Sequence, residues 1–523
     1  MKNIGRYIVL SMLRLAQVAC SDFLKEYSQD LVVAKSVTDY DELMLGSVYM
    51  PSYPYSTRRL PSGTASCAFL NVLDDDIDMV KGESVLGDVD VWMYSVKACF
   101  GYYAWQLEVG RSLDGASEVD DNATWNDLYT RINLLNVILD EIGDISVKTD
   151  QEKSDRIRIQ GECHFLRAQF YLVLVNLYGD AYAPSTAAET LGVPLKLTGY
   201  VEHEQGKPTQ FDRAPLTEVY AQIVADLKAS VQCLSESPQT HSYYRVSEQA
   251  ARLLLSRVYL YMQDWKNARE AARELLALKP MLSDMSTMND STSVFLSEDS
   301  EEILFSQGSL TTQSILTGHA GDYCVSGDLY DCYDHETDKR SMVFFGYTGS
   351  GDSVSLKGKF KRGDHQSRVS DILMLRSAEA YLNMAEACAM LGDPEANQWL
   401  NGLRRKRITG YLDRTYAGEE LIGQVRLERR RELCFEGHRW FDLRRYAACE
   451  THPYKREITH VFHAYSDNRF IYESGQGYVL KMDDPAYTFA IPKKVIEFDL
   501  VGMPNNKREK RSPEWITVWG DED

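Results

Sequence analysis

Apolar residues recur at helical spacing along most of this 523-residue chain. Positions three and four residues apart share one face of an α-helix, so this spacing predicts amphipathic helices. The predicted helices are 38–50, 88–110, 122–142, 152–178, 214–234, 246–262, 265–278, 370–391, 395–407 and 419–446. The pattern therefore predicts a mostly helical, all-α protein.

One pair of predicted helices carries a repeat signal. Five of its positions fit the small, aromatic, small, small and proline positions of the 34-residue tetratricopeptide pattern: Ser256, Tyr259, Ala268, Ala272 and Pro280. Gln263 to Trp265 are predicted to make the turn, and residues 378–407 repeat the plan more loosely, turning at Leu391 to Pro394. Each pair leaves an apolar face that only a neighbour can cover, so stacked pairs predict a solenoid.

Three segments lack helical periodicity and read as loop insertions: 51–87, 281–369 and the aromatic stretch 447–488. A few short strands are predicted, such as Ile303 to Ser306 and Ser355 to Phe360. We expect residues 20–523 to form one domain, in which an N-terminal part (about 20–230) and a C-terminal part (about 231–523) are intertwined.

Residues 429–446, RRRELCFEGHRWFDLRRY, combine a helical pattern with dense charge; we call them the signature segment. Glu428, Glu432 and Glu436 fall at i, i+4 and i+8, and like charges at that spacing repel unless cations lie against them. The available cations are Arg404, Arg405, Arg407, Arg430, Arg431 and Arg439. Two interpretations remain: Glu432, Glu436 and His438 as a catalytic cluster, or an ion-paired helix that locks the C-terminal part to the core. The second is favoured.

Charge and cysteine usage exclude several classes of function. The net charge of −20 argues against nucleic acid as a partner and against an anionic bilayer, because phosphate binding needs clustered cations. The ten cysteines have irregular spacing without CxxC, which predicts neither a disulfide framework nor a zinc site.

No metal or cofactor site is predicted either. Asp74, Asp76 and Asp78 begin like a calcium loop, but Met79 and Val85 stand where that loop needs glycine and glutamate. We therefore expect a solvated acidic turn there. The chain also lacks the short motifs of nucleotide-binding sites and of serine hydrolases.

The amino terminus has the pattern of a secretion signal. Lys2 and Arg6 accompany a short apolar stretch, Tyr7 to Leu13, which predicts a signal peptide over residues 1–19. Ala19-Cys20 resembles the end of a lipobox, in which the Cys20 thiol would be acylated. Because other stretches fall short of about 18 apolar residues, membrane attachment would be by the lipid alone.

The signature segment closely resembles that of the SusD/RagB family, the surface nutrient-binding lipoproteins of Bacteroidetes. Further segments are similar to family segments and occur in family order: Trp105-Gln106, Trp125 to Asn136, Gly161 to Gly179, Arg213 to Leu227, Asp371 to Leu391 and Phe489 to Ile496. Trp105 and Trp125 match positions that look structural in the family.

This resemblance implies a fold, a partner and a function. The fold would be a right-handed tetratricopeptide-like solenoid of about four helix pairs, with loop insertions that carry the ligand site. The partner would be a SusC-like TonB-dependent transporter, to which the protein delivers an oligomeric nutrient without catalysis. A glycan is the leading ligand, and RagB-like peptide binding is the alternative. Two hypotheses come from other classes of protein. A helical glycoside hydrolase would need a glutamate of raised pKa in a deep cleft. A repeat scaffold that binds only proteins would have a concave face without exposed aromatic residues.

Exposed aromatic residues in loops are the best guide to a sugar site, because a flat ring can stack on the apolar face of a sugar. The predicted ligand-binding residues are Tyr53, Tyr55, Trp92, Tyr102, Tyr103, Tyr323, Tyr330 and Tyr333.

Overall fold

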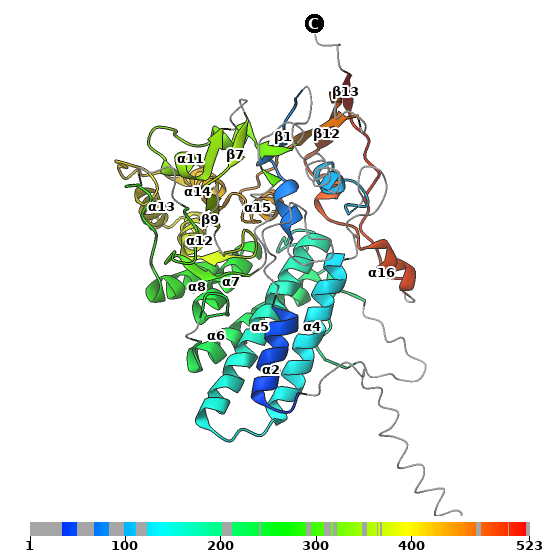
Figure 1. Ribbon diagram of the computed structural model, residues 1–523, viewed down its shortest axis with the longest axis vertical. Helices are drawn as coiled ribbons and strands as arrows, with labels where there is room; N and C mark the ends of the chain where they lie inside the picture. Colours follow the sequence, from blue (N-terminus) through cyan, green and yellow to red (C-terminus); the bar gives the residue numbers. More distant parts are fainter. Residues whose placement is uncertain are drawn as a thin grey trace, which may run out of the picture.

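Long helices fill one end of the molecule, and the two larger β-sheets lie at the other (Figure 1). The computed structural model describes residues 34–49, 67–82, 99–110, 123–200, 212–239, 242–288, 294–307, 315–316, 322–347, 353–362, 365–366, 369–466, 472–499 and 502–518. Cys20, Tyr53, Tyr55 and Trp92 lie outside these residues.

Most of the principal helices follow the predicted periodicity, but the one predicted over 370–391 begins at Ser377, after a short strand at 375–376. Most of the helix predicted over 88–110 lies outside the described residues. The principal helices are α2 (Val37–Leu43), α4 (Ala123–Glu141), α5 (Asp150–Tyr178), α6 (Leu216–Glu236), α7 (Glu248–Tyr261), α8 (Trp265–Leu278), α12 (Ser377–Met390), α13 (Ala396–Arg405), α14 (Gly418–Leu433) and α15 (Arg439–Ala447). Shorter helices are η1 (Met44–Val48), η2 (Ala68–Val72), η3 (Ile142–Asp144), α10 (Gly327–Tyr330), α11 (Lys339–Phe344), η4 (Pro485–Tyr487) and α16 (Lys493–Phe498). None of the described helices is long and apolar enough to cross a bilayer.

Helices that follow one another in the chain pack side by side. Helix α5 lies between α4 and α6, and α8 packs against both α7 and α12. The predicted turn between α7 and α8 is confirmed: Gln263 has a φ of 60° there, and the Ser256 hydroxyl donates to the Ala268 carbonyl at 2.9 Å. The predicted pair of α12 and α13 is confirmed as well, with Gly392 in its turn at a φ of +69°.

One predicted helix is wrong, because residues 419–446 form two helices and not one. Helix α14 ends at Leu433 and α15 begins at Arg439. Between them Phe435 and Gly437 have φ values of 60° and 76°, which an α-helix cannot accommodate. Glu436 therefore lies beyond the helix that carries Glu428 and Glu432.

Within the described residues, the strands form five small sheets. Their order is β1-β5-β7-β6, β11-β12-β13, β10-β4, β2-β3 and β8-β9. The strands are β1 (Ile77–Met79), β2 (Leu191–Pro194), β3 (Arg213–Pro215), β4 (Ile303–Phe305), β5 (Tyr323–Val325), β6 (Phe345–Tyr347), β7 (Val354–Leu356), β8 (Lys361–Arg362), β9 (His365–Gln366), β10 (Leu375–Arg376), β11 (Ile458–Tyr465), β12 (Tyr472–Leu480) and β13 (Trp515–Val518).

The strand predictions are only partly right. The strand predicted at 303–306 is present as β4, and the one at 355–360 is reduced to β7. Residues 447–488, expected to be loop, contain the two longest described strands, β11 and β12, which pair antiparallel from Ile458↔Leu480 onwards. Thr459 of β11 and Glu473 of β12 are exposed, whereas residues 477–480 at the end of β12 are buried.

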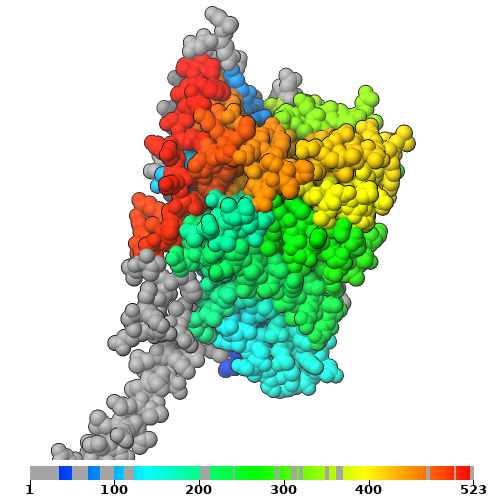
Figure 2. Space-filling view, turned by 180° about the vertical axis from the view of Figure 1, so that it is seen from behind, coloured from blue at the N-terminus to red at the C-terminus, as the bar shows by residue number. Residues whose placement is uncertain are grey.

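The rear face shows how the chain is layered. In Figure 2 the surface passes from the cyan and green helices α4 to α8 to the yellow and orange segments of α13 to α15, with the red C-terminal segment beside them. The strand-bearing end is thus built from segments distant in sequence. Ile77 of β1, for example, pairs with Val325 of β5.

Candidate functional site

The carboxylates of the signature segment are buried and ion-paired. Glu432 is fully buried, and its oxygens lie 2.6 Å from Arg376, 2.9 Å from Arg407 and 2.9 Å from Arg340. Such a cluster binds the chain together, because each charge removed would leave its partners buried and uncompensated.

Its neighbours are satisfied in the same way. Glu428 lies 2.7 Å from both Arg340 and Arg404, and Glu436 lies 2.7 Å from both Arg376 and Lys359. We call these side chains together with Glu432, Arg407 and Glu302 the ionic core. The geometry supports the ion-paired interpretation of the segment.

Three of the six cations proposed from the sequence reach these glutamates: Arg404, Arg407 and Arg431. The exposed Arg405 pairs with Asp413 instead. Arg430 pairs with Asp76, and Arg439 pairs with Asp75. Sequence reasoning missed Arg340, Lys359 and Arg376, because they are brought in from 56 to 92 positions away in sequence.

The proton affinities in the ionic core do not suit acid–base chemistry. Burial raises the pKa of Glu432, but the guanidinium groups of Arg407, Arg376 and Arg340 outweigh it and hold that pKa well below its usual range. Burial lowers the pKa of His438 well below 6.5, and the nearby arginines lower it further. A general acid near neutral pH needs the opposite shift for a glutamate.

The turn at Asp74 to Asp76 is buried, so the prediction of a solvated acidic turn is wrong. Asp75 accepts two hydrogen bonds from Arg439, at 2.7 and 2.8 Å, and Asp76 accepts one from Arg430 at 2.7 Å. Arg430 belongs to α14, and Arg439 is the first residue of α15. The turn therefore ties the strand-bearing end to the signature segment.

Four of the predicted ligand-binding aromatics are buried, so the expectation that they are exposed is wrong. Tyr102, Tyr103, Tyr323 and Tyr333 are each 4% exposed or less. Tyr102 stacks on Phe69 at 4.5 Å, Tyr103 stacks on His460 at 4.2 Å, and the Tyr333 hydroxyl donates to the Arg431 carbonyl. Their rings pack in the hydrophobic core, so they offer no free face to a sugar.

Of the five predicted aromatic residues that the structure describes, Tyr330 is the one that is only half-buried. Its ring stacks on exposed His335, with centroids 4.2 Å apart, and meets the ring of Tyr347 edge-on at 5.9 Å. Tyr347 is 55% exposed. Burial raises the pKa of Tyr330 to about 12, and its hydrogen bond with Tyr347 adds to the rise. We call Tyr330, His335 and Tyr347 the Tyr330 patch.

The patch has the composition of a sugar platform. Its rings lie on α10, the following loop and β6, beside the exposed carboxylates of Asp331 and Asp334. Sequence reasoning missed His335 and Tyr347, although both belong to the same insertion as Tyr330. The available signal was that residues 281–369 concentrate aromatic side chains outside helices.

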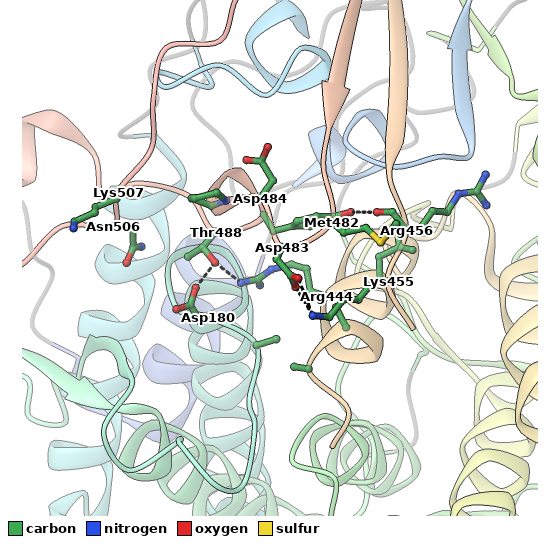
Figure 3. Close-up of a pocket in the computed structure, with 16 residues that line it drawn as sticks. Asp180, Arg444, Lys455, Arg456, Met482, Asp483, Asp484, Thr488, Asn506 and Lys507 are labelled. Atoms are coloured by element: carbon green, nitrogen blue, oxygen red, sulfur yellow. Dashed lines mark hydrogen bonds and ion pairs between the residues drawn. The ribbon is translucent and has the colours of Figure 1, made fainter. Parts of the chain in front are cut away.

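A polar cleft of about 490 Å³ lies where α5 and α15 end against the residues that follow β12 (Figure 3). On one side Thr488 links Asp180, at 2.6 Å, to Arg444, at 3.0 Å. On the other side Lys455 pairs with Asp483 at 2.8 Å. Burial lowers the pKa of Arg444, which nearby Asp180 partly opposes. The cleft can hydrogen-bond hydroxyl groups, but the ring of Tyr487 in its wall is occupied by stacking on Trp440.

Models of known families match two long stretches of the chain. Residues 83–260 match a family described as starch-binding and associating with the outer membrane, and residues 309–498 match the SusD family. The chain belongs to the SusD/RagB family. The signature segment thus falls within a family match, as its resemblance predicted.

Curated relatives and solved structures agree with this membership. The SusD-like proteins P25 and P2 of Formosa agariphila are 22% and 23% identical to this SusD-family chain, over 62% of it and over 69% and 72% of their own lengths. A SusD-like carbohydrate-binding protein from Bacteroides vulgatus is similar in fold, with a TM-score of 0.62 and 21% identity over 92% of this chain and 94% of that one. A SusD superfamily protein from Bacteroides thetaiotaomicron has a TM-score of 0.65 and 19% identity, covering 90% and 100%.

Proposed function

We propose that this SusD-family protein captures a glycan at the cell surface and delivers it to a SusC-like TonB-dependent transporter. The observation that carries the proposal is the match to a family described as starch-binding and associating with the outer membrane. The Tyr330 patch supports it, because it combines accessible rings with hydrogen-bonding groups, as recognition of a sugar requires.

The same proposal includes how the protein is anchored and built. Residues 1–19 would be removed as a signal peptide, and a lipid on Cys20 would hold residues 20–523 at the outer membrane. The pairs α7–α8 and α12–α13 would belong to a right-handed tetratricopeptide-like solenoid. The side-by-side packing of successive helices supports this interpretation. Tyr53, Tyr55 and Trp92 remain predicted ligand-binding residues.

Catalysis is not part of the proposal. Among the described glutamates, those with a shifted pKa all shift downward: Glu386, Glu428, Glu432, Glu436 and Glu450. A glycosidase needs a carboxylic acid of raised pKa to protonate the leaving group. Burial raises the pKa of three described aspartates, Asp74, Asp76 and Asp78, the last to about 6. None of the three lines the polar cleft. The lining of the cleft therefore favours binding without turnover.

Calorimetric titration of residues 21–523 against soluble polysaccharides, their oligosaccharides and mixed peptides tests the proposal. We expect saturable binding of one glycan, with the glycan recovered at its original length. Binding of peptides alone would contradict glycan capture and favour the RagB-like alternative. Shortened glycan chains would contradict a purely binding role.

A further inference from the structure

We propose that a groove along helix α14 is a second carbohydrate site, which takes one or two rings of a neutral sugar. The groove encloses about 510 Å³ between α14, α15 and the loop 451–454, and it shares no lining residue with the polar cleft or the Tyr330 patch. The class of ligand rests on the proposed function. The volume is within the range of small-molecule sites.

The floor of the groove is one face of helix α14. Residues 419, 422, 423, 426, 427 and 430 line it, and their spacing of three and one places them on one face of α14. Gly423 stands at the middle of this face, within a 16-residue helix. A helix with glycine in its interior is less stable than the same helix with alanine. The glycine at this position therefore needs an explanation.

Packing does not supply that explanation. A Cβ atom added to Gly423 would meet nothing within 4 Å, so the fold has room for a side chain that would project into open space. A glycine on a helix surface lets another molecule approach the backbone closely. The exposed glycine at position 423 therefore points to an occupant of the groove.

The walls carry the two kinds of group that a sugar needs. The guanidinium of Arg426 lies 4.4 Å from the centroid of the Tyr446 ring and donates to the His452 carbonyl at 2.9 Å. Its Nε is buried and has no hydrogen-bond acceptor. Across the groove Tyr454 is 42% exposed, and its backbone N–H donates to the Tyr446 carbonyl at 2.9 Å. The groove thus holds a fixed planar donor, Arg426, and an accessible ring, Tyr454, which can stack on a sugar.

The charges of the groove favour a neutral sugar over an anionic one. Arg430 and Arg439 also line it, but Asp75 and Asp76 pair with their guanidinium groups. At one end His452 lies 3.2 Å from Glu419. Most of the charged side chains that line the groove are thus paired within the protein. We therefore expect the groove to bind a ligand through hydrogen bonds to hydroxyl groups and not by attracting an anion.

Hydrogen–deuterium exchange of the full chain tests this site directly. The probes are maltohexaose, cellohexaose, xylohexaose and mannohexaose, each at millimolar concentration. We expect one of them to slow exchange in peptides covering 419–430 and 451–454. Gly423→Gln should remove this protection and weaken binding there at least tenfold, whereas the small control Gly423→Ala should keep both. Tyr454→Ala should also weaken binding.

The outcomes separate this site from the proposed function. Because the added side chain at 423 has room, Gly423→Gln should melt no lower than the original protein, so a loss of binding cannot be a loss of folding. An oligosaccharide that binds while 419–430 and 451–454 stay unprotected would overturn the groove and leave glycan capture standing. Unchanged protection in Gly423→Gln would also overturn it. Binding of no glycan at all would overturn both proposals.

Discussion

At the scale of single residues, buried charge pairs explain the signature segment better than catalysis does. Arg376 is 1% exposed and touches Glu302, Glu432 and Glu436 through one guanidinium group. The sequence could indicate that the glutamates need cations, because their spacing is local. It could not indicate Arg376 or Arg340, because those contacts depend on how distant segments fold together.

Removal of one member of the ionic core should be costly. Arg376→Ala leaves three buried carboxylates short of a partner, and we expect the free energy of unfolding to fall by about 3–5 kcal/mol. The matched control is Arg405→Ala, because Arg405 and Asp413 form a half-exposed pair; such pairs contribute about 0.2–1 kcal/mol. Urea unfolding followed by circular dichroism measures both. Equal losses in the two variants would refute the structural role of the ionic core.

His460 should make the protein sensitive to acid. It is 1% exposed, and burial lowers its pKa to about 4. The carbonyl oxygens of Tyr103 and Asp74 lie 2.8 and 3.0 Å from its two ring nitrogens, and because only the protonated ring can donate to both, they oppose the shift. Between pH 4 and about 6.5, the unfolded chain binds a proton here and the folded chain does not. The free energy of unfolding should therefore fall as the pH falls through this window, by up to about 1.4 kcal/mol per pH unit.

The measurement is stability against pH for His460→Gln beside the original protein. The slope between pH 4 and 6.5 should be shallower in the variant. If the variant kept the original slope, His460 would not carry the acid sensitivity.

At the scale of elements, local patterns predicted the helices well and the strands poorly. Helix α8 occupies 265–278 as expected, since its apolar spacing is complete within the helix. Strands such as β1 and β5 are three residues long, and their partners are about 250 positions apart. This separation also explains the aromatic residues, because Tyr103 and Tyr323 become core only when these distant segments meet.

Substitution by alanine should change the free energy of unfolding in opposite directions at two glycines of the α14–α15 region. Gly423 is helical with open space at its Cβ position, so Gly423→Ala should raise the free energy of unfolding by about 0.5–1 kcal/mol. Gly437 has a φ of +76°, which strains other residues, so Gly437→Ala should lower it by about 1–3 kcal/mol. Thermal unfolding of the two variants measures the difference. The same sign for both would contradict the break between α14 and α15.

At the scale of the whole molecule, the helical end and the strand-bearing end have different tasks in this account. The helices bury most of the core, and the Tyr330 patch belongs to the strand-bearing end through Tyr347 of β6, a strand of the four-stranded sheet. Sequence reasoning identified the family and one accessible ring of this patch. It could not select Tyr330 from the five described candidates, because exposure is decided by tertiary packing and not by residue type.

Calorimetric titration of the Tyr330→Ala variant with the glycan bound by the original protein tests the central claim most directly. Loss of a stacking ring should weaken binding at least about tenfold, equivalent to about 1.4 kcal/mol. Tyr200→Ala is the control, because Tyr200 is 62% exposed and its hydroxyl bonds to Glu141 of α4, at the helical end. Tenfold weaker binding by Tyr330→Ala, with Tyr200→Ala unchanged, is the predicted result. Unchanged affinity in Tyr330→Ala would contradict glycan capture at the Tyr330 patch.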